Sequence, residues 1–145
     1  MGLIRRFEID IELALAICSA ARAEATELGV LMSIAIVDAG GHLISFQRMD
    51  GAEIAGPVLA RDKAYTAVAH RIDTASLTTL AAPDGELAGL NAADQGRYIT
   101  FAGGIPLWDG LRVIGGVGAS GGSAGQDTKA AAAAGAVYER AIRGH

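Results

Sequence analysis

Short, glycine-containing turns constrain this fold more than any other feature of the sequence. Five segments have the apolar or alternating pattern of β-strands: 32–37, 42–48, 98–101, 105–108 and 112–119. Only a few residues separate the first two segments, and the same holds within the last three. A parallel crossover needs about a dozen residues or more, so strands this close in sequence must be antiparallel. We therefore predict a mainly antiparallel sheet of five strands.

The rest of the chain has mostly helical patterns. Helices are expected at 7–28, at 58–71, from Thr74 or Ser76 towards Leu80, and at 127–142, with loop and short helical turns over 83–97. The resulting order, α-β-β-α-α-β-β-β-α, places helices against an antiparallel sheet. This is an α+β architecture, and we expect residues 1–145 to form a single domain.

Composition indicates how the layers pack and excludes several classes of function. The chain has 30 alanines and 20 glycines but only 5% aromatic residues, so its core must be built from small side chains. A net charge of −4 gives no basic footprint for nucleic acid. No run approaches the roughly 20 apolar residues of a membrane span, and the single cysteine excludes an internal disulfide. We therefore expect a cytoplasmic protein without nucleic-acid or membrane partners.

The glycine cluster at 115–122 is the most suggestive local motif. It follows a predicted strand and precedes the last helix, a position where backbone N–H groups can hold a carboxylate or phosphate. The alternative is that these glycines only allow turns and close approach of strand and helix. Gly116, Gly118 and Gly121 match the spacing of a dinucleotide-binding fingerprint, but they follow a hairpin rather than opening a βαβ unit, so we reject that interpretation.

Several motifs in a fixed order carry a resemblance to a known family. They lie at 37–43, 48–52, 60–67, 103–107, 109–110, 113–115, 118–122 and 126–127, with Arg71 and Thr74 between them. Together they resemble the GlcG/HbpS-like family of haem-binding proteins, and also the C-terminal domain of some corrinoid adenosyltransferases, over residues 14–134. The resemblance implies a profilin-like fold, with a five-stranded antiparallel sheet flanked by helices, and a homo-oligomer. It also implies haem as a possible cofactor.

A haem iron needs an axial donor such as His, Met, Cys or Tyr. His70 lies near the end of the second predicted helix, beside Arg71, whose guanidinium suits a propionate. We predict His70 as the iron ligand; the alternative is that it is a cation favoured at a helix C-terminus. His42 is expected in a turn, and Met49 is expected to have a packing role.

Cationic side chains near the motifs suit an anionic ligand. Arg48 ends a predicted strand and Lys63 lies in a helix among alanines, so either can face a carboxylate or remain a surface charge. The full set of predicted ligand-binding residues is Arg48, Lys63, His70, Arg71, Gly103, Gly104, Gly118, Ser120, Gly121 and Gly122. Asp127 is expected to cap the last helix.

Three functions follow from this sequence. The first is binding of a small anionic ligand, with haem as the leading candidate. The second is a cofactor-independent catabolic enzyme, a lyase or isomerase that transfers protons on a carboxylated or carbonyl substrate, with Lys63, His70 and Asp127 as candidate acids and bases. The third is an accessory structural subunit that assembles through the alanine-rich last helix, residues 130–134.

Overall fold

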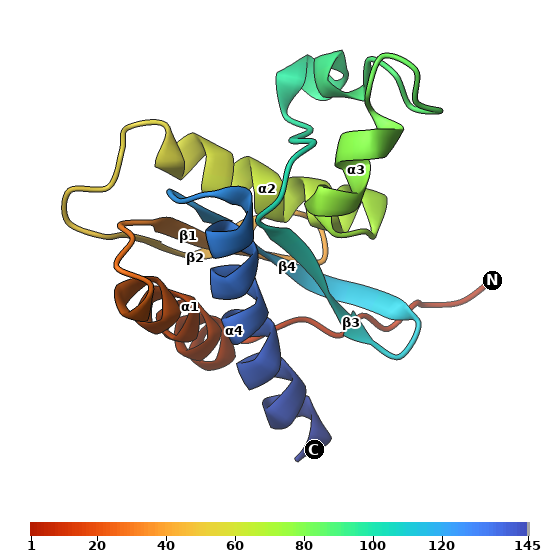
Figure 1. Ribbon diagram of the computed structural model, residues 1–145. Coiled ribbons are helices and arrows are strands. Elements are labelled where there is room, and N and C mark those ends of the chain that lie inside the picture. The colour runs from red at the N-terminus through yellow and green to blue at the C-terminus, as the bar shows by residue number, and fades with distance from the viewer. Residues whose placement is uncertain (145) are drawn as a thin grey trace.

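The computed structural model describes residues 1–144 as three layers, with helices on both faces of one sheet (Figure 1). The helices are α1 (Ile11–Glu27), α2 (Gly56–His70), α3 (Thr74–Leu80) and α4 (Ala124–Arg143), with short 3₁₀ turns at Leu90–Ala92 and Asp94–Gly96. The strands are β1 (Ser33–Asp38), β2 (Leu43–Arg48), β3 (Gly104–Asp109) and β4 (Arg112–Ser120). They form one antiparallel sheet in the order β2-β1-β4-β3. The predicted α+β class is confirmed.

The sheet has four strands in the described chain, not the five predicted. The segment 98–101 has the apolar pattern of a strand but no strand partner, because side-chain hydroxyls take its backbone groups instead. Thr66 Oγ1 accepts a hydrogen bond from the Ile99 N–H (3.0 Å), and Thr78 Oγ1 donates to the Thr100 carbonyl (2.8 Å). These threonines lie on α2 and α3, so the segment is bound to the helical layer.

Alternating residues of β1 build two cores, one on each face of the sheet. Ile34 and Ile36 face the layer of α1 and α4, which also contains the fully buried Tyr138. Ala35 and Val37 face α2. This alternation is the period-two pattern of a strand covered on both sides.

Capping side chains determine where the helices begin. Asp10 accepts a hydrogen bond from the Leu13 N–H (2.8 Å), so α1 starts at Ile11 and the preceding residues are extended or irregular. Ser123 caps α4 in a reciprocal capping box with Gln126. The prediction that Asp127 caps this helix is therefore wrong, and Asp127 lies one turn inside it. The residue before α3 is Asp73, not Thr74 or Ser76, and its side chain makes no capping bond.

Small residues bring the layers close together. A Cβ on Gly118 would overlap the carbonyl oxygen of Ala60 on α2, so the absence of a side chain lets helix and strand touch. The alanines of α4 have a similar role: Ala130, Ala131 and Ala134 are fully buried within the chain, in the core that α4 shares with α1. None of the helices described in residues 1–144 is long and apolar enough to cross a membrane.

Candidate functional site

The predicted site residues lie at two opposite ends of the sheet. At one end, β4 finishes and α4 begins, and the glycines of 118–122 approach those of 103–104. At the other end lie the β1–β2 turn, the β3–β4 turn and the C-terminus of α2. The sequence could not show this separation, because each end combines residues that are far apart along the chain.

A buried ion pair occupies the first end. Lys63 Nζ donates to Asp127 Oδ2 at 2.9 Å and to the Ala119 carbonyl at 3.0 Å, and it lies 5.2 Å from the centre of the Phe101 ring. The Lys63 side chain is fully buried and Asp127 is 5% exposed. Burial lowers the pKa of Lys63, while the hydrogen bond and the charge of Asp127 oppose that shift. The pair therefore links α2 to α4 at the end of the sheet where β4 finishes.

The protein's own carboxylate takes the position in which the sequence suggested a ligand anion. The second oxygen of Asp127 accepts the Gly122 N–H at 2.8 Å, near the N-terminus of α4. A Cβ on Gly103 would lie 2.9 Å from Lys63 Nζ, and one on Gly104 would overlap the Lys63 carbonyl oxygen. The predicted residues collected around this pair are Lys63, Gly103, Gly104, Gly118, Ser120, Gly121, Gly122 and Asp127.

The candidate acids and bases do not form one catalytic group. Lys63 and Asp127 are brought together, but they neutralise each other in an enclosed position. His70 lies at the end of α2, where its ring packs edge-on against Tyr98 with ring centres 4.4 Å apart. Its Nε2 atom is buried and has no hydrogen-bond partner within residues 1–144. Burial removes water from this nitrogen and no hydrogen bond replaces it, which is an uncommon arrangement and a feature of some ligand-binding sites.

A cavity of about 550 Å³ lies at the other end of the sheet. The N-terminal segment, the β1–β2 turn, the C-terminal half of α2 and the β3–β4 hairpin line it. Four arginines contribute to its wall, and we call it the arginine cavity: Arg5, Arg6, Arg71 and Arg112. Apolar residues line the rest together with Tyr65 and the turn glycines, and no aspartate or glutamate is among the described residues of the wall.

Sequence reasoning found only Arg71 among these four arginines. Arg5 and Arg6 precede the first helix and Arg112 follows a hairpin turn, so no local spacing connects them. The available signal was a pair of arginines next to the apolar residues Ile4 and Phe7, outside any predicted helix. That signal is weak by itself, because arginines outside regular structure are usually solvated surface residues.

A row of aromatic rings connects the cavity wall to His70. Tyr65 lines the cavity, and its ring is stacked with that of Tyr98 at 6.0 Å between centres; Tyr98 in turn packs on His70. The Tyr65 hydroxyl donates to Asp94 at 2.5 Å. This hydrogen bond, with a smaller effect of burial, raises the pKa of Tyr65 to about 12. The phenol is therefore held in its protonated form.

Arg48 lines a different and smaller groove. It pairs with Ser33 in the sheet, as Ser120 does on the other side of β1, so it lies at the ion-pair end. The groove has a volume of about 340 Å³ and is lined by Arg22, Leu31, Gln47, Arg48, Met49 and Asp50. Neither Lys63 nor Arg71 lines it, so the structure distributes the predicted cations over three places. Within residues 1–144, no three His, Cys, Asp or Glu side chains are grouped to hold a metal ion.

Comparison with known proteins identifies the relatives of this chain. Residues 9–136 match the family model described as haem degrading protein HbpS-like. The corrinoid adenosyltransferase PduO of Citrobacter freundii is 44% identical over 108 residues, which are 74% of this chain and 32% of that protein. The crystal structure of Klebsiella pneumoniae protein ORFY superposes with a TM-score of 0.91 at 32% identity and covers 96% of this chain and 97% of its own. The crystal structure of a PduOC:heme complex superposes with a TM-score of 0.87 at 37% identity, over 90% and 95% of the two chains.

Proposed function

This chain belongs to the HbpS-like family, and we propose that it binds haem in the arginine cavity. One observation carries the proposal: the cavity combines apolar walls with four arginines and no acidic residue among the described residues that line it. Haem has the complementary chemistry, a flat apolar macrocycle with two carboxylates. The family match and the relative solved as a heme complex support the same ligand.

The dimensions and charge of the cavity suit this ligand. Its volume of about 550 Å³ lies within the usual range for sites that bind small molecules or cofactors. Arginine binds carboxylates in a planar, two-pronged geometry that lysine cannot reproduce. Arg71 follows α2 in the left-handed backbone conformation (φ 56°), so the helix ends here, and Val68, Ala69 and Arg71 itself line the cavity.

We propose His70 as the iron ligand, in agreement with the sequence prediction. The buried and unpartnered Nε2 atom supports this assignment, because a metal bond would satisfy it. His70 is not among the residues that line the arginine cavity, and the Tyr98 ring packs against it on the side of Tyr65, so this assignment requires Tyr98 to move. Tyr65 is the other candidate because it lines the cavity, but a raised pKa of about 12 opposes formation of the phenolate that iron binds.

A haemin titration followed in the Soret region tests the proposal. We expect saturable binding of one haemin per chain, weaker binding by Arg71→Ala, and a shifted Soret maximum for His70→Ala. Arg140→Ala, which removes an exposed arginine from α4, is the matched control and should bind like the wild type. An unchanged spectrum for His70→Ala together with a changed one for Tyr65→Phe would assign the iron to Tyr65. Absence of saturable binding by the wild type would refute the proposal.

A further inference from the structure

We infer that the N-terminal segment, residues 4–7, belongs to the ligand site, and that Arg5 and Arg6 act with Arg71 and Arg112 as a clamp for two separate anionic groups. The ligand class is a flat apolar molecule carrying two carboxylates or equivalent anions. This inference rests on the proposed function, in that it assigns how the same cavity holds its ligand.

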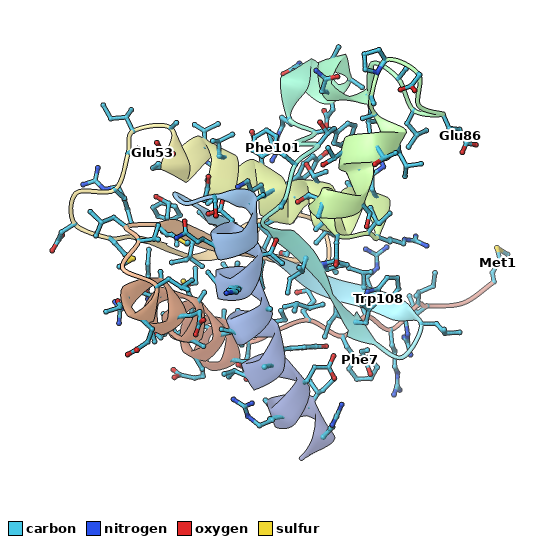
Figure 2. All side chains as sticks on the ribbon, viewed as in Figure 1. Met1, Phe7, Glu53, Glu86, Phe101 and Trp108 are labelled. Atoms are coloured by element: carbon cyan, nitrogen blue, oxygen red, sulfur yellow. The ribbon has the colours of Figure 1, made fainter. Side chains whose placement is uncertain are left out.

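The segment is anchored at one point and otherwise lies loosely against the domain. Ile9 is buried beside Gly115, where a Cβ would approach the Ile9 side chain to 2.5 Å, and Asp10 caps α1. Upstream of this anchor, the Phe7 ring lies 5.5 Å from the Arg112 guanidinium, on the side of the β3–β4 hairpin (Figure 2). No hydrogen bond or ion pair within residues 1–144 involves residues 1–8. The segment can therefore rearrange around a ligand without breaking polar contacts of the fold.

The four guanidinium groups lack carboxylate partners within the described chain. Of the other six arginines, only Arg97 and Arg143 have such partners in the described chain, Asp62 at 3.3 Å and Glu139 at 3.7 Å, so the cavity is distinguished by four unpaired arginines in one wall. The chain has an excess of acidic residues, with a net charge of −4, yet none of them is among the described residues that line the arginine cavity. Asp38 and Asp94 lie next to the cavity, where they accept hydrogen bonds from the lining residues Gly40 and Tyr65. Like charges gathered around one cavity repel each other, and a bound anion removes that repulsion.

Apolar side chains around the cavity define the rest of the ligand. Ile4 is 84% exposed, Phe7 57% and Leu111 97%, and all three line the cavity. Inorganic anions would leave this surface in water, whereas a ligand with a flat apolar body would cover it. Four arginines in one wall supply enough N–H donors for two anionic groups, because a single guanidinium can give two N–H donors to one carboxylate.

The test compares probes that separate charge from iron. The variant is Arg5→Ala/Arg6→Ala, and the control is Arg140→Ala/Arg143→Ala, which removes two exposed arginines from α4. The probes are metal-free protoporphyrin IX, which keeps both carboxylates, its uncharged dimethyl ester, and haemin. We expect the variant to bind protoporphyrin IX at least about tenfold more weakly, the loss that corresponds to about 1.4 kcal/mol. The dimethyl ester should bind wild type and variant equally.

Limited trypsin digestion provides a second readout on the unmodified protein. Trypsin cleaves after Arg5 and Arg6, and mass spectrometry follows the products. Bound protoporphyrin IX should slow cleavage at these two sites, and the dimethyl ester should protect them less. Thermal melts check that the variant folds, which we expect because residues 1–8 make no hydrogen bonds.

The outcomes separate this inference from the proposed function. If haemin binds to wild type and variant equally and trypsin cleavage is not slowed, the clamp is refuted and haem binding stands. If protoporphyrin IX binds in an Arg5- and Arg6-dependent manner but haemin does not bind, the clamp stands and haem binding falls. If no dianionic probe binds to the wild type, both are refuted.

Discussion

Replacing Lys63 by methionine tests whether the glycine-lined end of the sheet is structural. Methionine retains most of the length and apolar volume of the lysine stem but removes the ammonium. Asp127 would then keep only the Gly122 N–H as a partner while remaining 5% exposed. The carboxylate would be a buried charge without a counter-charge.

The expected cost follows from this geometry. Removing one partner of a buried ion pair destabilises proteins by about 3–5 kcal/mol, because the other charge stays uncompensated. The Lys63–Asp127 pair fits that case, with 2.9 Å between charged atoms and both side chains buried. In Lys63→Met/Asp127→Leu both charges are absent, so the double variant should lose much less than the sum of the two single variants. We expect a coupling free energy of about 2–3 kcal/mol, in the upper range for residues in contact.

Urea denaturation at neutral pH measures these free energies of unfolding, because a domain of this size usually unfolds in a two-state transition. Lys129→Met is the matched control: it removes the other lysine of the chain, an exposed residue of α4, and should change stability by less than about 0.5 kcal/mol. Two results would contradict the argument: a loss of unfolding free energy below about 1 kcal/mol for Lys63→Met, or additive losses in the two single variants. Either would mean that the ion pair with Lys63 does not stabilise the buried Asp127 carboxylate. The glycine loops would then again be candidates for binding an external anion.

Two further predictions concern packing and pH. Gly118→Ala should destabilise by about 1–3 kcal/mol or more in urea titrations, because its Cβ would overlap the carbonyl of Ala60. Gly125→Ala, in the first turn of α4 with no atom within 4 Å of the new Cβ, should stabilise by about 0.5–1 kcal/mol, and similar losses at both sites would contradict the argument. Burial raises the pKa of Tyr138 to about 12, so its contribution to stability is present below the unfolded value near 10 and is lost as the pH rises towards 12. Thermal melts at about pH 9 and about pH 11 should therefore show the stability difference between wild type and Tyr138→Phe shrinking, and a constant difference would refute this assignment.

The antiparallel sheet could be predicted from sequence because its determinants are local. Short turns, such as those at Gly41 and Gly110, both with positive φ, force neighbouring strands to be antiparallel. The prediction of a fifth strand was wrong because of contacts with residues outside the segment. Residues 98–101 have an apolar pattern, but their backbone groups bond to the hydroxyls of Thr66 and Thr78. The sequence of the segment itself does not indicate these partners.

The sequence allowed individual residues of the candidate site to be singled out, but not the contacts between them. Lys63 and Asp127 were each recognised as chemically notable, but 64 positions separate them and no spacing rule pairs them. The capping role expected for Asp127 belongs to Ser123, four residues earlier, and this leaves the carboxylate free to meet Lys63. The family motifs include both Lys63 and Asp127, whereas the pairing of the two side chains depends on how α2 and α4 lie at the end of the sheet.

The two ends of the sheet differ in the source of the negative charge, and this difference supports our proposal that the ligand binds in the arginine cavity. At the glycine loops, Lys63 and the Gly122 N–H both find their anion in Asp127, so an external anion would have to displace a buried carboxylate. At the arginine cavity, four arginines line one wall, and no described aspartate or glutamate lines it with them. A protein with an excess of acidic residues has no shortage of side chains to neutralise them. The uncompensated charge is the basis of our proposal that an anion from outside the chain binds at this end of the sheet.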